Sequence, residues 1–220
     1  MSDIGWITAA ELREQFKENR DGWNESLRVR VHRAISWLQS AEKHSEDNDI
    51  ALLSLMISLH ACYLTDEFSE NQTKHSAKES WARFTKNLQE TSQMRQLQML
   101  LQKTDHFGFL MAVSMNPYLH AETYSDGLEA GKAAAKASNT RLQELFKKDA
   151  TSEMLIFIFE NLNTLRNQIA HGSRTYDSEL NSSAVEQGKK FLFEAVPLII
   201  EALIENPELD WGELEFSVVK

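Results

Sequence analysis

The chain of 220 residues is acidic, with a formal net charge of -10 that comes from 33 Asp and Glu against 23 Lys and Arg. This charge argues against a general nucleic-acid coat protein, because such proteins displace counterions with broad positive surfaces. A hydrophobic fraction of 42% and a charged fraction of 25% are typical of a soluble globular protein. Only 8 Gly and 3 Pro are present, which favours long helices over many short strands.

The first quarter of the chain predicts three helices. Thr8-Ala9-Ala10-Glu11 is a capping box and predicts a short N-terminal helix. Asn24 can cap the next helix, in which apolar residues recur at helical spacing. These residues are Leu27, Val31, Ala34, Leu38 and Ala41. Residues 47–49 then break the chain before an apolar stretch at 50–64. Polar side chains interrupt that stretch and it is too short to span a bilayer, so we expect a buried helix.

The middle of the chain is less regular. Ser76-Ala77-Lys78-Glu79 is a second capping box and predicts the start of another helix. Residues 106–124 are expected to form a short helix and an ordered loop, because Gly108 and Asn116-Pro117 disturb a long helix. Residues 130–146 are rich in Ala, Lys and Glu and are expected to be helical by propensity.

The last third predicts two long helices and a tail. Ser152 can cap the first of them, and Ser183-Ala184-Val185-Glu186 is a third capping box for the second. Pro197 is expected to kink the last helix, and the chain after Pro207 reads as an extended tail. With no repeat and no linker visible, the simplest organisation is one all-α domain over residues 1–220, with a core at roughly 24–205.

The strongest candidate for a functional site is the segment Leu165-Arg166-Asn167-Gln168-Ile169-Ala170-His171-Gly172. It ends an amphipathic helix whose apolar seam is formed by Leu155, Ile158, Leu162, Leu165 and Ile169. Arg166 lies on the flank of the seam, whereas Glu160, Asn163, Asn167 and His171 fall on the opposite side. Gly172 suits the position after the helix, which places His171 in the last turn. A guanidinium that holds phosphate and an imidazole that moves protons suit RNA cleavage.

Spacing alone leaves a structural interpretation open. A polar stripe opposite an apolar seam is usually a solvated face, and an Arg-x-x-x-x-His pattern often arises by chance. The net charge does not exclude an enzyme that grips one or two phosphates locally. Arg166, Arg174, Lys189 and Lys190 are close in sequence and are expected to supply a small positive field there.

Other kinds of site have little support. His60 lies within an apolar run and is expected to be a core residue, and the His-Glu-x-x-His pattern is absent. The single cysteine, Cys62, cannot form an internal disulfide or a cysteine-based zinc site. The first residues also lack the pattern of a secretory signal. We therefore expect no metal, no cofactor, no membrane attachment and a reducing, cytoplasmic location.

The motif segment resembles the Arg-Asn-x-x-x-His signature of HEPN domains (higher eukaryotes and prokaryotes nucleotide-binding). Residues 181–188 and the ending Asn206-Pro207-Glu208-Leu209-Asp210-Trp211-Gly212 resemble a bacterial branch near the ApeA-like members, as does Asn116-Pro117-Tyr118. Residues 33–38 and 57–64 resemble its N-terminal half more loosely. Together the resemblance covers roughly residues 28–212 and is strongest from Leu155 onward.

The resemblance implies an α-helical bundle, usually a homodimer, in which two copies of the motif helix face each other and form a metal-independent RNase site. The family's arginine, asparagine and histidine carry over to Arg166, Asn167 and His171. A role in a bacterial toxin system or in phage defence follows from the same resemblance, with RNA as substrate and an unknown antitoxin or defence-system partner. The alternative is a non-catalytic dimerisation or adaptor module, in which these three residues only cap and cross-link a polar helix interface.

One position departs from the family pattern. HEPN toxins that a nucleotidyltransferase partner silences often carry tyrosine two residues after the histidine. Here that position is Ser173, and the nearest tyrosine is Tyr176. The resemblance therefore does not extend to that mode of regulation.

Overall fold

The computed structural model describes residues 7–64 and 77–214, apart from the side chains of residues 77–79. The described residues form an all-α fold, as the sequence predicts. The helices in chain order are α1 (Ala9–Asn19), α2 (Glu25–Lys43), α3 (Asn48–Tyr63), α4 (Ala77–Leu88), α5 (Gln93–Gln102), α6 (Thr104–Ser114), the 3-10 helix η1 (Pro117–Leu119), α7 (Glu122–Ser125), α8 (Leu128–Lys147), α9 (Thr151–Ala170) and α10 (Ser182–Glu205).

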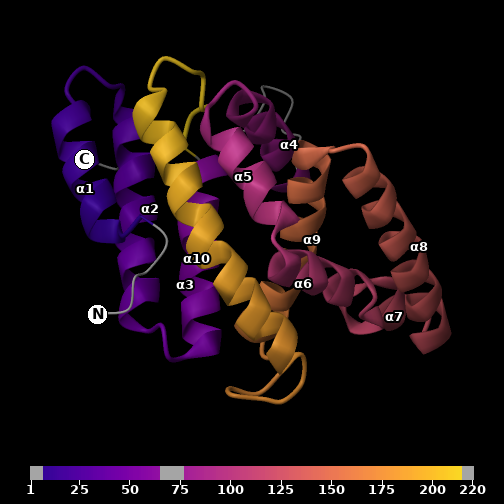
Figure 1. Ribbon diagram of the computed structural model, residues 1–220. Helices are drawn as coiled ribbons and strands as arrows, with labels where there is room; N and C mark the ends of the chain where they lie inside the picture. The colour runs from indigo at the N-terminus through magenta and orange to yellow at the C-terminus, as the bar shows by residue number, and fades with distance from the viewer. Residues whose placement is uncertain (1–6, 65–76, 215–220) are drawn as a thin grey trace, which may run out of the picture.

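Helices α3, α9 and α10 supply much of the core. The α2–α3 hairpin and α1 lie at one end of the molecule, α7 and α8 lie at the other, and α10 runs diagonally between them (Figure 1). Helix α3 packs against α2, α10 and α9, and it is apolar on most sides, as expected of a buried helix. Helix α8 runs antiparallel to α9 along the outer edge of the fold (Figure 1).

The predicted N-terminal caps are confirmed where local sequence decides them. Thr8 and Glu11 form the capping box of α1, with the Thr8 backbone N–H donating to Glu11 Oε2 at 2.8 Å. Asn24 accepts a hydrogen bond from Leu27 N at the start of α2 (2.7 Å). Asp47, in the predicted break at 47–49, caps α3, although no cap is predicted there from the sequence. All five predicted core residues of α2 are buried. The capping box predicted at Ser76 lies outside the described residues.

Two predictions about the starts of the last two helices are wrong. Ser152 does not cap α9: it lies in the first turn, and its hydroxyl accepts a hydrogen bond from Gln89 Nε2. The box at 183–186 does not start α10, because the helix begins one residue earlier, after Asn181 in a left-handed conformation (φ 57°). The short helix predicted within 106–124 is confirmed, because α6 ends at Ser114 before Asn116-Pro117, although Gly108 lies inside it and α7 adds a further turn.

A buried arginine fixes the C-terminal tail to the core. The Arg30 side chain is fully buried, and Nη1 donates to the carbonyls of Ala61, Cys62 and Leu64 at the end of α3. Its Nη2 donates to the carbonyls of Gly212 and Glu213 in the tail (3.1 and 3.2 Å). The guanidinium thus satisfies carbonyls that a helix end leaves without intrahelical partners. Burial lowers the pKa of Arg30 to about 10.

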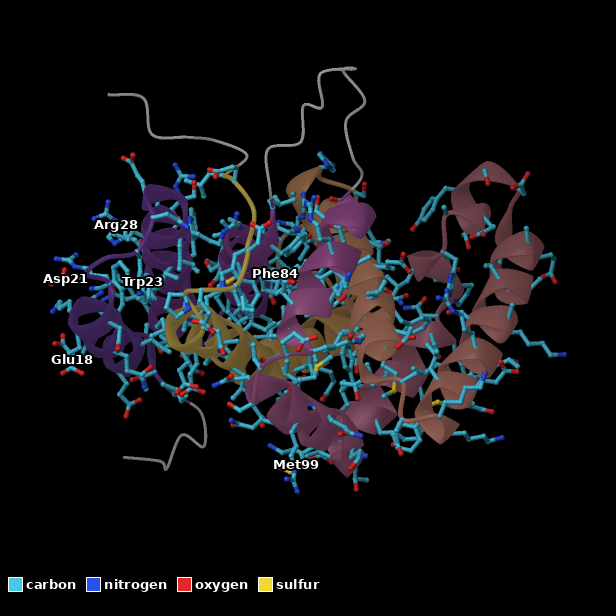
Figure 2. All side chains as sticks on the ribbon, turned by 90° about the horizontal axis from the view of Figure 1, so that it is seen from above. Glu18, Asp21, Trp23, Arg28, Phe84 and Met99 are labelled. Atoms are coloured by element: carbon cyan, nitrogen blue, oxygen red, sulfur yellow. The ribbon has the colours of Figure 1, made fainter. Side chains whose placement is uncertain are left out.

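The tail is non-helical, as predicted, but it packs closely. The Trp211 ring is buried against Phe84, with 5.1 Å between ring centroids, and Trp211 Nε1 donates to Asn206 O. Figure 2 shows Phe84 toward the middle of the molecule, whereas the labelled charged side chains Glu18, Asp21 and Arg28 lie at its outer edge. The division between apolar interior and charged surface is that of an ordinary globular fold.

None of the described helices combines the length and the apolar character needed to cross a membrane. Cys62 is buried, and burial raises the pKa of its thiol to about 12, which makes it unreactive as a nucleophile.

Candidate functional site

The motif lies at the C-terminal end of α9, and its position there follows from the sequence. Four of the five predicted seam residues are buried and Ile169 is half-buried. The helix ends where Gly172 adopts a positive φ of 70°. Gly172 N donates to Ile169 O (3.2 Å) and Ser173 N donates to Gln168 O (2.8 Å), the hydrogen bonds of a Schellman motif. His171 is therefore the C-cap residue of α9, and its side chain is exposed.

Arg166 is half-buried on the flank of the seam, as predicted. Its Nη2 donates to Asn163 Oδ1 at 2.8 Å, and its Nε is buried without a hydrogen-bond acceptor. Among the described residues no carboxylate forms an ion pair with it. Since a buried guanidinium N–H without an acceptor is costly, the group is suited to receive an anionic oxygen.

His60 of α3 lies near Arg166. Its ring is half-buried and packs edge-on to Tyr63, with 5.4 Å between centroids. Burial, together with the positive charge of Arg166, lowers the pKa of His60 to about 4. The imidazole is therefore neutral near pH 7. The expectation of a core histidine is right in part, because the ring packs against Tyr63 and is not fully buried.

Asn167 and His171, the other two motif residues, lie on a different face of α9 from Arg166. Asn167 is half-buried, and its carbonyl accepts the backbone hydrogen bond from His171 N at 2.9 Å. Within the described chain, neither of their side chains takes part in a hydrogen bond. Arg166 and His171 are separated by about 140° around the helix and about 7.5 Å along it. One copy of α9 therefore does not bring the guanidinium and the imidazole to a single point.

Gln168, in the middle of the motif, has a structural role that sequence reasoning missed. The side chain is buried, and its Nε2 donates to Tyr118 O (2.9 Å) and lies 3.1 Å from Tyr124 Oη. Its Oε1 accepts from Asn181 Nδ2 at 2.9 Å, and Asn181 Oδ1 in turn accepts from Asn116 Nδ2. This network joins the end of α9 to η1, α7 and the start of α10. The Asn116-Pro117-Tyr118 stretch singled out in the sequence is thus part of the support for the motif.

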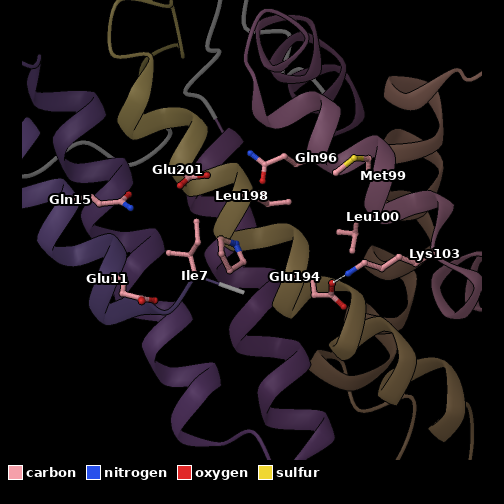
Figure 3. Close-up of a pocket in the computed structure, with 11 residues that line it drawn as sticks. Ile7, Glu11, Gln15, Gln96, Met99, Leu100, Lys103, Glu194, Leu198 and Glu201 are labelled. Carbon is pink, nitrogen blue, oxygen red and sulfur yellow. Dashed lines mark hydrogen bonds and ion pairs between the residues drawn. The ribbon is translucent and has the colours of Figure 1, made fainter. Parts of the chain in front are cut away.

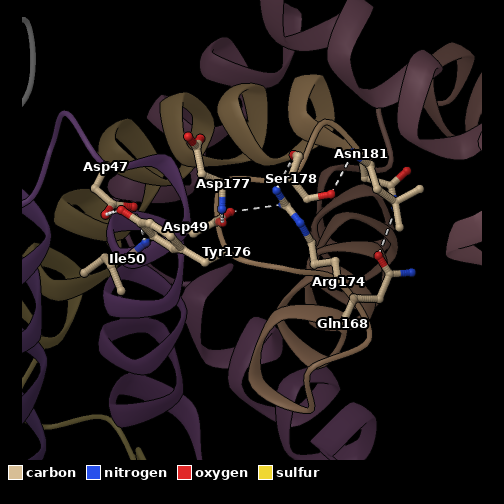
Figure 4. A network of polar contacts seen from close by, with 10 residues as sticks. Asp47, Asp49, Ile50, Gln168, Arg174, Tyr176, Asp177, Ser178 and Asn181 are labelled. Atoms are coloured by element: carbon tan, nitrogen blue, oxygen red, sulfur yellow. Dashed lines mark hydrogen bonds and ion pairs between the residues drawn. The ribbon is translucent and has the colours of Figure 1, made fainter.

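The loop after the motif is held to the start of α3 (Figure 4). Buried Arg174 forms an ion pair with Asp49, with 3.0 Å between Nη1 and Oδ1, and its Nη2 donates to Ser178 O. Asp177 N donates to Asp49 Oδ2, and the Tyr176 hydroxyl donates to Asp47 Oδ2. These contacts fix the path of the chain directly after His171.

Two of the four cations that the sequence places near the motif are paired with carboxylates. Arg174 is buried against Asp49. Lys189 Nζ donates to Ser45 O (2.7 Å), and Lys190 forms an ion pair with Glu186 (2.7 Å). Arg166 alone of the four is paired with neither a carboxylate nor a backbone carbonyl in the described part of the chain. Arg166 and Lys189 are therefore the two of these four cations that no described carboxylate pairs with.

Two hollows lie away from the motif. One, of about 580 Å³, lies between α1, α5 and α10 and is lined by acidic and apolar residues such as Glu11, Glu201 and Leu198 (Figure 3). Burial raises the pKa of Glu201 there. The other, of about 1210 Å³, lies between α6 and α10, where Lys103 contacts Glu194 and His106 Nε2 lies 2.9 Å from Glu194 Oε1. No residue of α9 lines either hollow, so neither belongs to the motif site.

In the described ranges no group of three or more His, Cys, Asp or Glu side chains is arranged to hold a metal ion. Comparison with family models, with curated proteins and with solved structures returns no match for this chain.

Proposed function

We propose that this protein is a metal-independent endoribonuclease of the HEPN type, and that it acts as a homodimer through Arg166, Asn167 and His171. The observation that carries the proposal is the motif at the end of α9. There His171 is exposed, and Arg166 presents a guanidinium that no described carboxylate neutralises. Both groups match the needs of phosphodiester cleavage.

The chemistry uses a nucleophile that RNA itself supplies. A base, His171 of one copy, takes the proton of the ribose 2′-OH, and the 2′ oxygen attacks the adjacent phosphorus. The bond from phosphorus to the 5′ oxygen breaks, that oxygen takes a proton from water, and the proton held by His171 passes back to the solvent. The products are a 2′,3′-cyclic phosphate and a 5′-hydroxyl. Arg166 binds the non-bridging oxygens, and Asn167 orients His171 or the phosphate.

A dimer is needed because one chain separates Arg166 from His171 on the helix surface. Exposed apolar side chains support an interface near the motif, since such groups mark interaction surfaces. They lie on η1, α7 and the flanking segments that the Gln168 network joins to α9. They are Met115, Tyr118, Tyr124, Leu128 and Leu180. The second copy is expected to cover this surface and to bring two motif helices together.

A non-catalytic dimerisation or adaptor module is the second candidate. The observation that favours it is the pairing of Arg174 and Lys190 with the carboxylates of Asp49 and Glu186, which reduces the positive charge that follows the motif in an acidic chain. In this case Arg166 and His171 only contact the second copy. The role in a toxin system or in phage defence belongs to the first candidate and rests on the motif alone.

Cleavage of total RNA and tRNA in the presence of EDTA separates the two candidates. His171→Ala is expected to slow cleavage by about 10² to 10⁴, and Arg166→Ala by about 10² or more. Arg166→Lys is expected to be impaired as well, because an ammonium cannot reproduce the bidentate fork. His44→Ala and Arg95→Ala, at exposed positions directly after α2 and on α5, are the matched controls and are expected to cleave like wild type.

Circular dichroism and light scattering show whether each variant keeps its fold and its dimer. Equal cleavage by wild type and His171→Ala would mean that a contaminating nuclease is responsible. A motif variant that loses its dimer while wild type cleaves no RNA would instead support the adaptor module.

A further inference from the structure

The guanidinium of Arg166 points back along α9, away from the end of the helix. Its Nη2 donates to Asn163 Oδ1 at 2.8 Å, one turn earlier, which is the direction in which helix side chains lean. Its Nε is buried without an acceptor, and its Nη1 forms no hydrogen bond to a described residue. The charged group therefore lies beside Asn163, and part of its hydrogen-bonding capacity is unused within the described chain.

A row of aromatic rings covers the side of α9 that carries Arg166. The Trp81 ring packs against Phe159 of α9 with 4.2 Å between centroids, and against Tyr63 of α3 with 4.8 Å. Tyr63 in turn packs against His60, with 5.4 Å between centroids. Phe159 lies two turns before Arg166, and the two positions differ by only about 20° around the helix. The row therefore joins His60 to the face of α9 on which Arg166 lies.

The direction of α3 brings His60 toward the motif. Asp49, at the start of α3, pairs with Arg174 beyond the end of α9. The row of rings holds Tyr63, at the end of α3, near Phe159 in the middle of α9. The two helices therefore run antiparallel, and a step back along α3 from Tyr63 is a step toward the C-terminal end of α9.

His60 and the guanidinium lie at the same level of the two helices. His60 is one turn before Tyr63, about 5 Å closer to the motif, and Asn163 is one turn after Phe159, about 6 Å in the same direction. Burial, and then the positive charge of Arg166, lower the pKa of His60, as expected of two groups at one level. The imidazole and the guanidinium are thus close together where α3 packs on α9.

The His60 ring is available for a further contact. It is half-buried, and neither of its nitrogens forms a hydrogen bond to a described residue. A neutral imidazole carries one N–H, and it adds no positive charge that would repel the guanidinium. Glu160, an acidic residue in this part of α9, lies about 120° around the helix from Arg166. Together the ring and the guanidinium offer two kinds of N–H donor, which suits an anion that carries several oxygens.

We propose that His60 is a second phosphate-binding residue beside Arg166, and that its neutral imidazole donates an N–H to one oxygen of the anion whose other oxygens face the guanidinium. The assignment of this anion as the scissile phosphate rests on the proposed function, whereas the anion site itself does not. His60 is then a residue outside the Arg-Asn-x-x-x-His motif that contacts the substrate. Because its ring stays neutral near pH 7, it holds the phosphate and leaves proton transfer to His171.

The direct test is NMR of the wild-type protein titrated with inorganic phosphate at pH 7. The reporters are the ring signals of His60 and the Nε–H signal of Arg166, with the ring of exposed His32 as the internal control. Phosphate is expected to shift both reporters along one binding curve and to leave His32 unchanged. In Arg166→Gln the His60 shift is expected to be lost. A wild-type His60 ring that does not respond to phosphate, whether or not Arg166 responds, would overturn the proposal.

Variants of His60 separate the N–H group from the ring. His60→Phe keeps a ring against Tyr63 and removes the donor, so phosphate binding read from Arg166 is expected to weaken about tenfold or more. His60→Gln supplies an amide N–H and is expected to recover part of the affinity. His32→Phe is the matched control and is expected to bind phosphate like wild type. Wild-type affinity in His60→Phe would show that the ring has a packing role alone.

Cleavage of RNA decides whether this anion is the scissile phosphate. In a wild type that cleaves, His60→Phe is expected to lower kcat/KM about tenfold or more, without a change in the shape of the pH profile that His171 sets. Phosphate binding that depends on His60, together with unimpaired cleavage by His60→Phe, would overturn the assignment to the scissile phosphate. A wild type that cleaves no RNA would overturn the proposed function instead, and the phosphate titration would still decide the anion site.

Discussion

Arg174 and Asp49 form a buried ion pair that ties the loop after the motif to the start of α3. The Nη1–Oδ1 distance is 3.0 Å, and the two side chains are 2% and 4% exposed. Asp49 Oδ2 also accepts the backbone hydrogen bond from Asp177 N. The pair therefore determines where the chain runs after His171, although neither residue belongs to the motif.

Arg174→Met is expected to lower the free energy of unfolding by about 3–5 kcal/mol, because the Asp49 carboxylate is then buried without its partner. The double variant Arg174→Met with Asp49→Asn is expected to recover part of that loss, since an amide is cheaper to bury than an unpaired charge. Urea unfolding of the wild type and both variants measures the effect. Arg174→Met with wild-type stability would show that the pair does not hold the loop.

Arg30 is a second charged residue on which the stability of the fold is expected to depend. Arg30→Met leaves five backbone carbonyls without their donor, and we expect a loss of about 3 kcal/mol or more in unfolding free energy. Arg30→Lys is expected to be destabilised too, because one ammonium cannot reach both the end of α3 and the tail. Arg28→Met, at an exposed position on the same helix, is the control and is expected to unfold like wild type.

His60 makes stability depend on pH in a defined window. Its pKa is lowered from 6.5 to about 4 in the folded chain, so between these values the unfolded chain binds the extra proton. The contribution of His60 to the free energy of unfolding is fully present above pH 6.5 and is lost as the pH falls toward 4. Across that window the slope of the free energy of unfolding against pH corresponds to the uptake of about one proton on unfolding. His60→Gln is expected to flatten the wild-type dependence across that window, as measured by urea unfolding at a series of pH values. Parallel curves for wild type and variant would contradict the assignment.

Local sequence decided the features that were predicted correctly. Thr8 and Asn24 cap their helices with contacts inside three residues, and the end of α9 follows from Gly172. For the same reason, the spacing of apolar residues predicted correctly which faces of α2 and α9 are buried.

Contacts between residues that are distant in sequence determine the features that were not predicted correctly. Ser152 bonds to Gln89 in place of capping α9, and Asn181 is held in a left-handed conformation beside Gln168, which moves the start of α10. The engagement of Arg174 by Asp49 could not be read from sequence spacing either. At the candidate site the sequence predicted the positions of Arg166 and His171 on the helix, but it did not predict their supports.

The most direct measurement of the central claim is cleavage by a mixed dimer in EDTA. Arg166→Ala and His171→Ala chains, each with a different tag, are coexpressed and purified through both tags, with the two parent variants as controls. Because Arg166 and His171 lie about 140° apart on one helix, a site built across two chains keeps one intact pair in the mixed dimer. The mixed dimer is therefore expected to regain about half of the wild-type cleavage rate per dimer while both parents remain inactive. A mixed dimer as inactive as its parents, although wild type cleaves, would contradict a site shared between two copies of α9.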